Sequence, residues 1–370
     1  MNELKKLTIN TSDIKDVASK LDPILKNGLE STPKILFRVE DKVTAYATNG
    51  ESYVKVTFNC ENEGKGEFAI SGEQFIGIVK NTSGKKIDLS LTDDSKLLIV
   101  ADSIKYKIAL IEGDTKYLIA PEMADTKSFE ISAQDLCSAI SAVSCCIDQG
   151  KAHLNCVMIH SDEKNKEKVY IVSTDCMRLG IAERKAVSSS DVIPNLLIPN
   201  QAASYINSIA NKSKENLLIK YTENTIQVSI NEVCYTAKLL DGSFPKYQSV
   251  IPDNKKVLEV KTSDFKEIIK KTAAISSNTS RIEMTLNKDK IDILCNDSIT
   301  GDNSNASIEA TFSDKSEMKI VCNHKMLQEI LDKISSNIVR ILITDGNTPM
   351  VIRSVDDESV KYIFMPLVAN

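Results

Sequence analysis

The sequence predicts an α+β protein built from three tandem copies of one domain. Three observations predict this fold class: a strand-then-helix pattern that occurs three times, a second helix that follows each occurrence, and alternating apolar segments that end in polar turns. A chain of 370 residues, 42% hydrophobic and 26% charged, has enough apolar material for two or three folded domains.

The first pattern is a short alternating strand that runs into an amphipathic helix. It begins at Leu7, Phe129 and Leu258. Each copy then has an aspartate in its first predicted helical turn, where the positive end of the helix dipole favours an anion. Apolar residues follow at the i, i+3, i+4, i+7 spacing of a helix face that packs on a core.

A second helix is predicted later in each copy. The strand that leads into it contains Ile70, Ile198 and Val321. The apolar residues that we expect to face the core from these helices are Phe75, Ile78 and Val79 in copy one, Tyr205, Ile206 and Ile209 in copy two, and Leu327, Ile330, Leu331 and Ile334 in copy three.

Alternating segments complete each copy. Residues 87–91, 226–230 and 339–343 alternate apolar and polar side chains and end in Asp, Asn or Gly, which predicts hairpins. A further polar turn holds Asn49 in copy one, with Asp175 and Asp297 at the same place in the other copies. Asp175 could be a catalytic acid, but its recurrence favours a residue that bonds to the turn backbone.

These landmarks set the domain boundaries. Glycine-containing linkers follow copies one and two, near Gly113 and Gly242. We expect domains at 1–125, 126–253 and 254–370, each with the order strand, helix, strands, helix, strands.

The composition argues against several classes of protein. Nine cysteines without a CxxC pair and three dispersed histidines indicate reduced core thiols, so neither disulfides nor a metal site is expected. No GxxxxGKS, GxxxxGKT or GxSxG motif occurs, and we expect neither catalysis nor a cofactor. The charged N-terminus and the lack of a long apolar run predict a cytoplasmic protein without a membrane span.

Three segments are similar to those of one known family. Residues 173–180 read STDCMRLG, residues 238–247 read KLLDGSFPKY, and residues 362–367 read YIFMPL. They resemble the Ala-Thr-Asp-Gly-His-Arg-Leu segment, the Asp-Gly-Arg-Phe-Pro linker and the Met-Pro-Met terminus of bacterial sliding clamps, the β subunits of DNA polymerase III. The resemblance extends over the whole chain. It implies a head-to-tail homodimer, a ring of six domains that encircles duplex DNA and tethers the replicative polymerase.

The resemblance also implies one peptide-binding groove per protomer, between domains two and three. DNA polymerase, the clamp loader and repair proteins would bind there by short linear peptides. Arg178 could be a surface ion-pair residue, but the resemblance favours a binding role, in which it would offer a donor at the rim, with prolines as walls. Cys176 and Met177 replace the family's usual Gly and His, so we expect a narrower groove. The residues that match the groove are Leu154, Thr174, Asp175, Cys176, Met177, Arg178, Leu179, Pro245, Val250, Met350, Met365, Pro366 and Leu367.

Two further surfaces follow from the resemblance. The ring would close where Tyr106 and Ile108, on one face of a strand, meet Ile275 of another protomer; the alternative is that all three are core residues. Lysines opposite the helical core faces would contact DNA phosphates nonspecifically, although any one of them could simply be solvated. They are Lys20, Lys26, Lys80, Lys212, Lys266, Lys270 and Lys333.

A second class of function remains open at this point. A triplicated α+β scaffold that binds proteins and never acts on DNA would fit the net charge of −5 slightly better. A ring is held on DNA by topology, however, and needs little affinity for phosphate.

Overall fold

The computed structural model describes residues 4–26, 33–92, 94–276, 280–297 and 300–368. The chain forms two compact units, and the division between them passes through the central copy. The first unit comprises Met1–Gln134, Val187–Asp191 and Ser204–Leu239, and the second comprises Asp135–Ala186, Val192–Ala203 and Leu240–Asn370.

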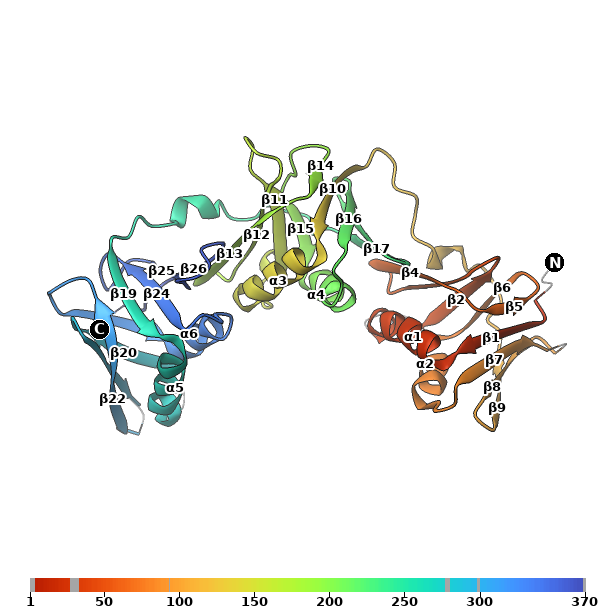
Figure 1. Cartoon of the computed structure of the whole chain (residues 1–370), viewed down its shortest axis with the longest axis horizontal. Helices are drawn as coiled ribbons and strands as arrows, with labels where there is room; N and C mark the ends of the chain where they lie inside the picture. Colours follow the sequence, from red (N-terminus) through yellow and green to blue (C-terminus); the bar gives the residue numbers. More distant parts are fainter. Residues whose placement is uncertain (1–3, 27–32, 93, 277–279, 298–299, 369–370) are drawn as a thin grey trace. The chain divides into compact units, whose positions relative to one another are not determined.

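The element order confirms the predicted sequence of strand, helix, strands, helix and strands in each copy (Figure 1). Copy one contains β1 (Lys6–Asn10), α1 (Thr11–Lys26), β2 (Lys34–Val39), β3 (Val43–Thr48), β4 (Ser52–Phe58), β5 (Glu61–Glu63), β6 (Gly66–Ser71), α2 (Gly72–Asn81), β7 (Lys86–Leu91), β8 (Lys96–Ala101), β9 (Ile104–Ala109) and η1 (Lys116–Leu118). Copy two contains β10 (Lys127–Ser132), α3 (Ala133–Val143), η2 (Ser144–Cys146), η3 (Ala152–Leu154), β11 (Cys156–Ser161), β12 (Lys168–Thr174), β13 (Arg178–Lys185), β14 (Ser188–Ser189), β15 (Leu196–Pro199), α4 (Asn200–Ala210), β16 (Asn216–Tyr221), β17 (Thr225–Ile230), β18 (Val233–Lys238) and η4 (Tyr247–Val250). Copy three contains β19 (Lys256–Lys261), α5 (Thr262–Thr272), η5 (Ala273–Ile275), β20 (Arg281–Leu286), β21 (Lys290–Asn296), β22 (Asn303–Phe312), β23 (Met318–Asn323), α6 (His324–Leu331), β24 (Ile338–Ile343), β25 (Met350–Ser354) and β26 (Val360–Phe364).

The first unit contains two antiparallel sheets. One has the order β5-β1-β7-β8-β9, and the other has the order β14-β10-β16-β17-β18-β4-β3-β2-β6. The second sheet joins copy one to copy two, because β4 pairs with β18 and places Tyr53 opposite Thr236. Helices α1 and α2 pack against each other within copy one (Figure 1).

Helix α2 shows where the predicted core faces need correction. It buries Gly72, Phe75, Ile76 and Val79, which is the i, i+3, i+4, i+7 pattern, whereas Ile78 is only half-buried. Gly72 belongs to this face because a Cβ atom there would come within 2.9 Å of the Leu25 side chain. The prediction was therefore wrong for Ile78, since it began the face at Phe75 and missed the glycine.

The other second helices differ less from their predicted faces. Tyr205 and Ile206 of α4 are buried, but Ile209 is half-buried, and the adjacent Ala210 takes the core position. In copy three all four expected residues are buried, although Ile334 lies beyond the end of α6.

The second unit contains one antiparallel sheet with the order β15-β11-β12-β13-β26-β25-β24-β19-β22-β21-β20-β23. Strand β13 of copy two pairs with β26 of copy three and places Leu179 opposite Ile363. The same kind of strand pairing therefore joins copies one and two in the first unit and copies two and three in the second.

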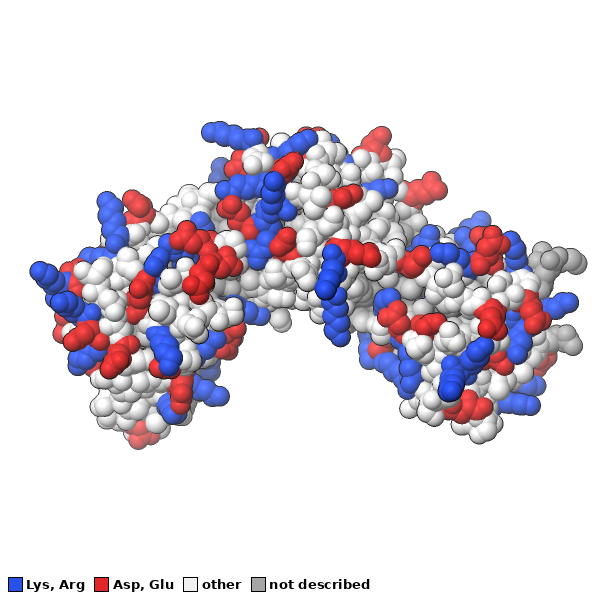
Figure 2. All heavy atoms as spheres, viewed as in Figure 1, with Lys and Arg blue, Asp and Glu red and all other residues white. Residues whose placement is uncertain are grey.

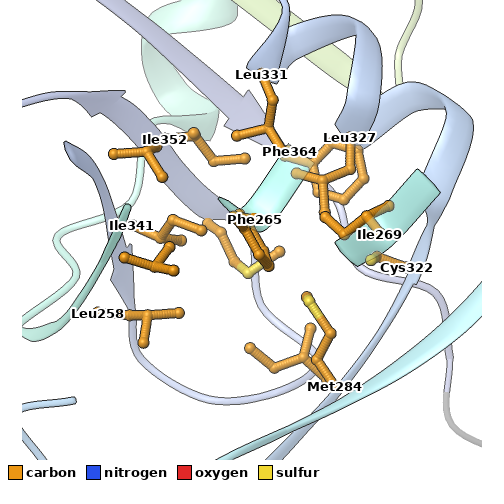
Figure 3. Close-up of a cluster of buried hydrophobic side chains, with 14 of the residues drawn as sticks. Leu258, Phe265, Ile269, Met284, Cys322, Leu327, Leu331, Ile341, Ile352 and Phe364 are labelled. Carbon is orange, nitrogen blue, oxygen red and sulfur yellow. The ribbon is translucent and has the colours of Figure 1, made fainter. Parts of the chain in front are cut away.

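A large hydrophobic core lies inside copy three (Figure 3). Phe265 and Ile269 of α5 and Leu327 of α6 are fully buried against strand residues that include Ile341 and Ile352. Removal of such side chains from water is the main stabilising contribution to a domain of this kind.

Within the described ranges, no helix has both the length and the apolar character that a bilayer crossing requires. The same residues contain no group of three or more His, Cys, Asp or Glu side chains placed to hold a metal ion. All nine cysteines are free thiols, and only Cys176 is exposed.

Candidate functional site

The linker after β18 covers part of the outer face of the sheet in the second unit. Phe244 and Tyr247 of this linker are buried against Met158, Val172 and Leu179, which project from β11, β12 and β13. This layer fixes the linker to the sheet, and a groove opens beside it.

The groove has a volume of about 280 Å³ and lies wholly within the second unit. The turn between β12 and β13, the linker and the end of β26 form its walls. Its expected lining residues are Thr174, Cys176, Met177, Arg178, Leu179, Pro245, Val250 and Met365. Lys246, Tyr247, Pro349 and Ile363 also line it and were missed by the sequence analysis.

Two signals in the sequence could have found the missed residues. Lys246 and Tyr247 follow Pro245 directly, in the same family-like segment. Ile363 lies in β26, two residues before Met365, which follows the end of that strand, so an extended chain places both side chains on the same side. Pro349 carried no such signal, because its position depends on the fold of the β24–β25 turn.

Five expected residues lie outside the lining of the groove. Leu154 is fully buried, and Met350 pairs with Phe364 and belongs to the core of copy three. Pro366 is buried, and the Leu367 amide donates to the Val321 carbonyl at 2.7 Å, which draws the chain toward β23. Asp175 is the fifth, and its carboxylate bonds to the backbone of the turn between β12 and β13.

The turn from Thr174 to Arg178 is organised by its own side chains. Asp175 Oδ1 accepts hydrogen bonds from the amides of Met177 at 2.9 Å and Arg178 at 2.5 Å. The Thr174 hydroxyl donates to the Arg178 carbonyl and accepts from the Cys176 amide. The expectation that Asp175 bonds to the turn backbone is therefore confirmed.

The equivalent turns of the other copies repeat this arrangement. Asn49 Oδ1 accepts from the amides of Glu51 and Ser52, and Asp297 Oδ1 accepts from the amide of Thr300. Gly50 has φ +92°, and Cys176, at the same place in copy two, has φ +71°. Glycine suits this left-handed conformation, whereas a cysteine there is strained.

Arg178, expected as a donor at the rim, lines the groove but is ion-paired in the structure. Its side chain is only 8% exposed, and its guanidinium donates to Asp175 Oδ2 at 2.9 Å and to Glu329 Oε2 at 2.5 Å. Burial opposes the charge, but the hydrogen bonds to Glu329 and Asp175 raise the pKa of Arg178 above its ordinary value. Because Nε bonds to Asp175 and Nη1 to Glu329, Arg178 supports the turn and ties it to α6.

Large apolar side chains are exposed at the mouth of the groove. Val250 is 52% exposed and Met365 is 39% exposed, on opposite walls. Apolar groups left in water beside a concave site are typical of a surface that binds apolar anchors. Methionine is well suited to such a surface because its flexible side chain adapts to different ligands.

A second pocket of the same construction lies in the first unit. It has a volume of about 340 Å³ and is formed where β4 pairs with β18, beside linker residues 121–124. Its lining includes Tyr53, Thr236 and Lys238. The two pockets lie at equivalent strand pairs, since β4 pairs with β18 in the first unit as β13 pairs with β26 in the second. Tyr53 lies opposite Thr236 in the first pair, and Leu179 lies opposite Ile363 in the second.

The two pockets differ in chemistry at three corresponding strand positions. The corresponding pairs are Tyr53 and Leu179, Thr236 and Ile363, and Lys238 and Met365. A polar or charged side chain in the first unit thus replaces an aliphatic or methionine side chain in the second. An apolar anchor would desolvate polar groups in the first pocket without satisfying them, so of these two pockets the groove in the second unit suits such a ligand better.

The seven lysines expected to face DNA fall into two groups. Asp22 holds both Lys26, at 2.9 Å, and Lys80, at 2.6 Å; Lys20 pairs with Asp16, and Lys266 lies 3.8 Å from Asp332. The other three, Lys212, Lys270 and Lys333, are exposed and form no salt bridge with any described residue. Figure 2 likewise shows basic and acidic side chains interspersed over the visible face.

The residues expected at the ring-closing interface have unequal exposure. Strand β9 is the edge of its sheet, and Ile104, Tyr106 and Ile108 share one face of it. Ile104 is 51% exposed and Tyr106 is half-buried, but Ile108 is only 6% exposed and belongs to the core. Ile275 lies in η5, half-buried against the core of copy three.

Comparisons with known proteins agree with this architecture. Residues 130–246 match the family DNA polymerase III beta subunit, central domain, and residues 248–368 match the family DNA polymerase III beta subunit, C-terminal domain. The beta sliding clamp of Caulobacter vibrioides is 21% identical over 372 residues, which cover 98% of this chain and 99% of the relative. The beta sliding clamp of Staphylococcus epidermidis is 20% identical over 354 residues, which cover 95% of this chain and 90% of the relative.

The fold similarity extends over the whole chain. The sliding clamp of Pseudomonas aeruginosa, solved with griselimycin bound, superposes with a TM-score of 0.92 at 19% identity and covers 99% of this chain and 100% of its own. Three α+β domains joined sheet to sheet define the sliding-clamp class of proteins.

The chain belongs to the family of bacterial β sliding clamps, the β subunits of DNA polymerase III, as a diverged member. It is a processivity factor of that polymerase and not an enzyme. The alternative of a scaffold unrelated to DNA is therefore not retained.

Proposed function

We propose that the chain acts in the cytoplasm as a head-to-tail homodimer whose six domains, bounded at residues 125 and 253 of each protomer, encircle duplex DNA. The ring closes through β9 and η5 and tethers the polymerase. The clamp loader, polymerases and repair proteins bind one groove per protomer by short linear peptides. The observation that carries this proposal is the exposed apolar groove of the second unit.

The groove chemistry supports peptides with leucine or phenylalanine anchors. Its volume of about 280 Å³ accommodates one or two such side chains rather than a folded surface. Met177, Leu179, Ile363 and Met365 supply apolar contact, and burial of a leucine or phenylalanine contributes about 1.5–3 kcal/mol. With its charge held by Asp175 and Glu329, Arg178 leaves this binding mainly apolar.

The polar pocket of the first unit provides a matched control within the same chain. Met365→Lys introduces into the groove the side chain that Lys238 has in the first unit, and Lys238→Met makes the reverse change. Both positions are solvent-accessible, so neither change should unfold the protein.

The test measures binding of a labelled synthetic peptide with leucine and phenylalanine anchors by fluorescence anisotropy. We expect Met365→Lys to weaken binding at least about tenfold, because an ammonium group must then be desolvated. Lys238→Met should leave the affinity unchanged. Unchanged binding by Met365→Lys, or an equal loss in both variants, would place the peptide elsewhere.

A further inference from the structure

His160 lies beneath the linker that forms one wall of the groove. It is on β11, on the same side of the sheet as Met158, and it is directly opposite Tyr170 of β12. Its ring stacks on Tyr170, with centroids 5.2 Å apart, and meets the ring of Tyr247 edge-on at 5.8 Å. Tyr247 itself lines the groove.

The hydrogen bonds of His160 define which ring nitrogen carries the proton. Nδ1 lies 3.1 Å from the carbonyl oxygen of Ser161, and Nε2 lies 2.9 Å from the hydroxyl of Tyr247. A carbonyl can only accept, so Nδ1 must donate the hydrogen. In the neutral ring Nε2 is then an acceptor, and the Tyr247 hydroxyl donates to it.

The surroundings favour the neutral ring. Burial lowers the pKa of His160 below its ordinary value of 6.5, although the bond to Ser161 and the charge of Asp162 act in the opposite direction. The other titratable groups around His160 are Tyr170, Tyr247 and Lys168. The Lys168 ammonium lies over the Tyr170 ring. At neutral pH His160 is therefore an acceptor for Tyr247.

Tyr247 lies between two other polar attachments of the linker, the Leu240 amide to the Leu197 carbonyl and the Asn254 side-chain amide to the Leu342 carbonyl, both at 2.9 Å. Tyr247 is 5% exposed, and its amide bonds to the Pro245 carbonyl at 2.7 Å within a tight turn. Pro245 and Val250, on either side of it, also line the groove. The position of the Tyr247 ring thus determines where this wall stands relative to the wall that carries Met365.

We propose that His160 is a positioning residue for the groove: by accepting the Tyr247 hydroxyl, it fixes the linker wall at the spacing that peptide anchors require. This inference rests on the proposed function of the groove. His160 does not line the groove, so its effect on peptide affinity would pass entirely through Tyr247.

A double-mutant cycle tests this role with the full-length protein and the anisotropy assay. His160→Leu leaves a buried hydroxyl without its acceptor, and we expect the peptide Kd to rise about fivefold. His160→Gln should restore most of the affinity, because its amide oxygen can accept from Tyr247. In a Tyr247→Phe background, His160→Leu should have no further effect. His153→Leu, at an exposed position, serves as the control.

The outcomes separate this inference from the proposed function. Failure of the unmodified protein to bind the peptide would refute the groove. If the unmodified protein binds and His160→Leu binds equally well, the positioning role is wrong. A loss that persists in the Tyr247→Phe background, or that His160→Gln does not rescue, would show that His160 acts by packing and not through the hydroxyl.

Discussion

At the residue scale, Cys176 shows a conflict between a side chain and its backbone. It takes φ +71° in a turn whose copy-one equivalent is Gly50 at +92°. The left-handed conformation costs a non-glycine residue roughly 1–2 kcal/mol. The turn persists because Thr174 and Asp175 bond its amides, and the exposed thiol adds to the lining of the groove.

We expect Cys176→Gly to stabilise the protein by about 0.5–1 kcal/mol, because the gain from relieved strain exceeds the entropy that glycine adds to the unfolded chain. Chemical denaturation of the two proteins measures the difference. Gly50→Ala is the matched control and should destabilise, since an alanine there would acquire the strain. A loss of stability in Cys176→Gly would show that the thiol makes a packing contribution larger than the strain.

The site was predictable at this scale only where its residues are close in sequence. The polar turn at Asp175 and the backbone role of its carboxylate were predicted correctly, because the bonded groups are neighbours in the sequence. The pairing of Arg178 with α6 could not be predicted, because its second partner, Glu329, is 151 positions away. Only its first partner, Asp175, lies near Arg178 in the sequence, three residues before it.

At the scale of elements, periodicity predicted which segments form helices and strands, and tertiary packing decided the details. The core face of α2 was predicted incorrectly because it includes Gly72, which has no apolar side chain but packs against Leu25. The prediction that helical lysines face DNA likewise did not include the carboxylates that pair with some of them. Asp22 of α1 holds Lys80 of α2, a contact between two helices that no local pattern indicates.

Lys270 of α5 is the clearest candidate for a DNA contact on a helix, since it is exposed and pairs with no described carboxylate. Lys270→Glu should shorten the residence time on DNA roughly threefold. It should also reduce, by about one, the slope of the logarithm of retention against the logarithm of salt concentration. Lys288→Glu, in a turn of the same copy, is the control and should behave as the unmodified protein. Equal effects of the two changes at low salt would indicate net charge rather than a specific contact.

At the scale of the whole molecule, triplication was visible in the sequence, but the joining of the copies was not. Strands β4 and β18 pair across copies, as do β13 and β26, over long separations in the chain. The register of these pairs decides which side chains meet at each pocket. The apolar groove and its polar counterpart could therefore be distinguished only once the pairing was known.

Ring closure leads to a prediction about Ile275. Its half-buried side chain would be covered by the partner, so Ile275→Asp should give a folded monomer, because a carboxylate in an apolar interface is not compensated. Sedimentation measures the mass, and circular dichroism reports folding. Ile338→Asp, at a position 41% exposed, should remain a dimer. An unfolded Ile275→Asp would instead assign Ile275 to the core of copy three.

The central claim is that the protein is held on DNA by encirclement. The most direct measurement is retention of the protein on closed circular DNA after loading by a clamp loader, compared with the same DNA cut once. Encirclement predicts stable retention on the circle at moderate salt and rapid loss from the linear form, because the ring slides off a free end. Equal retention on the two forms, or loss from both, would contradict the account.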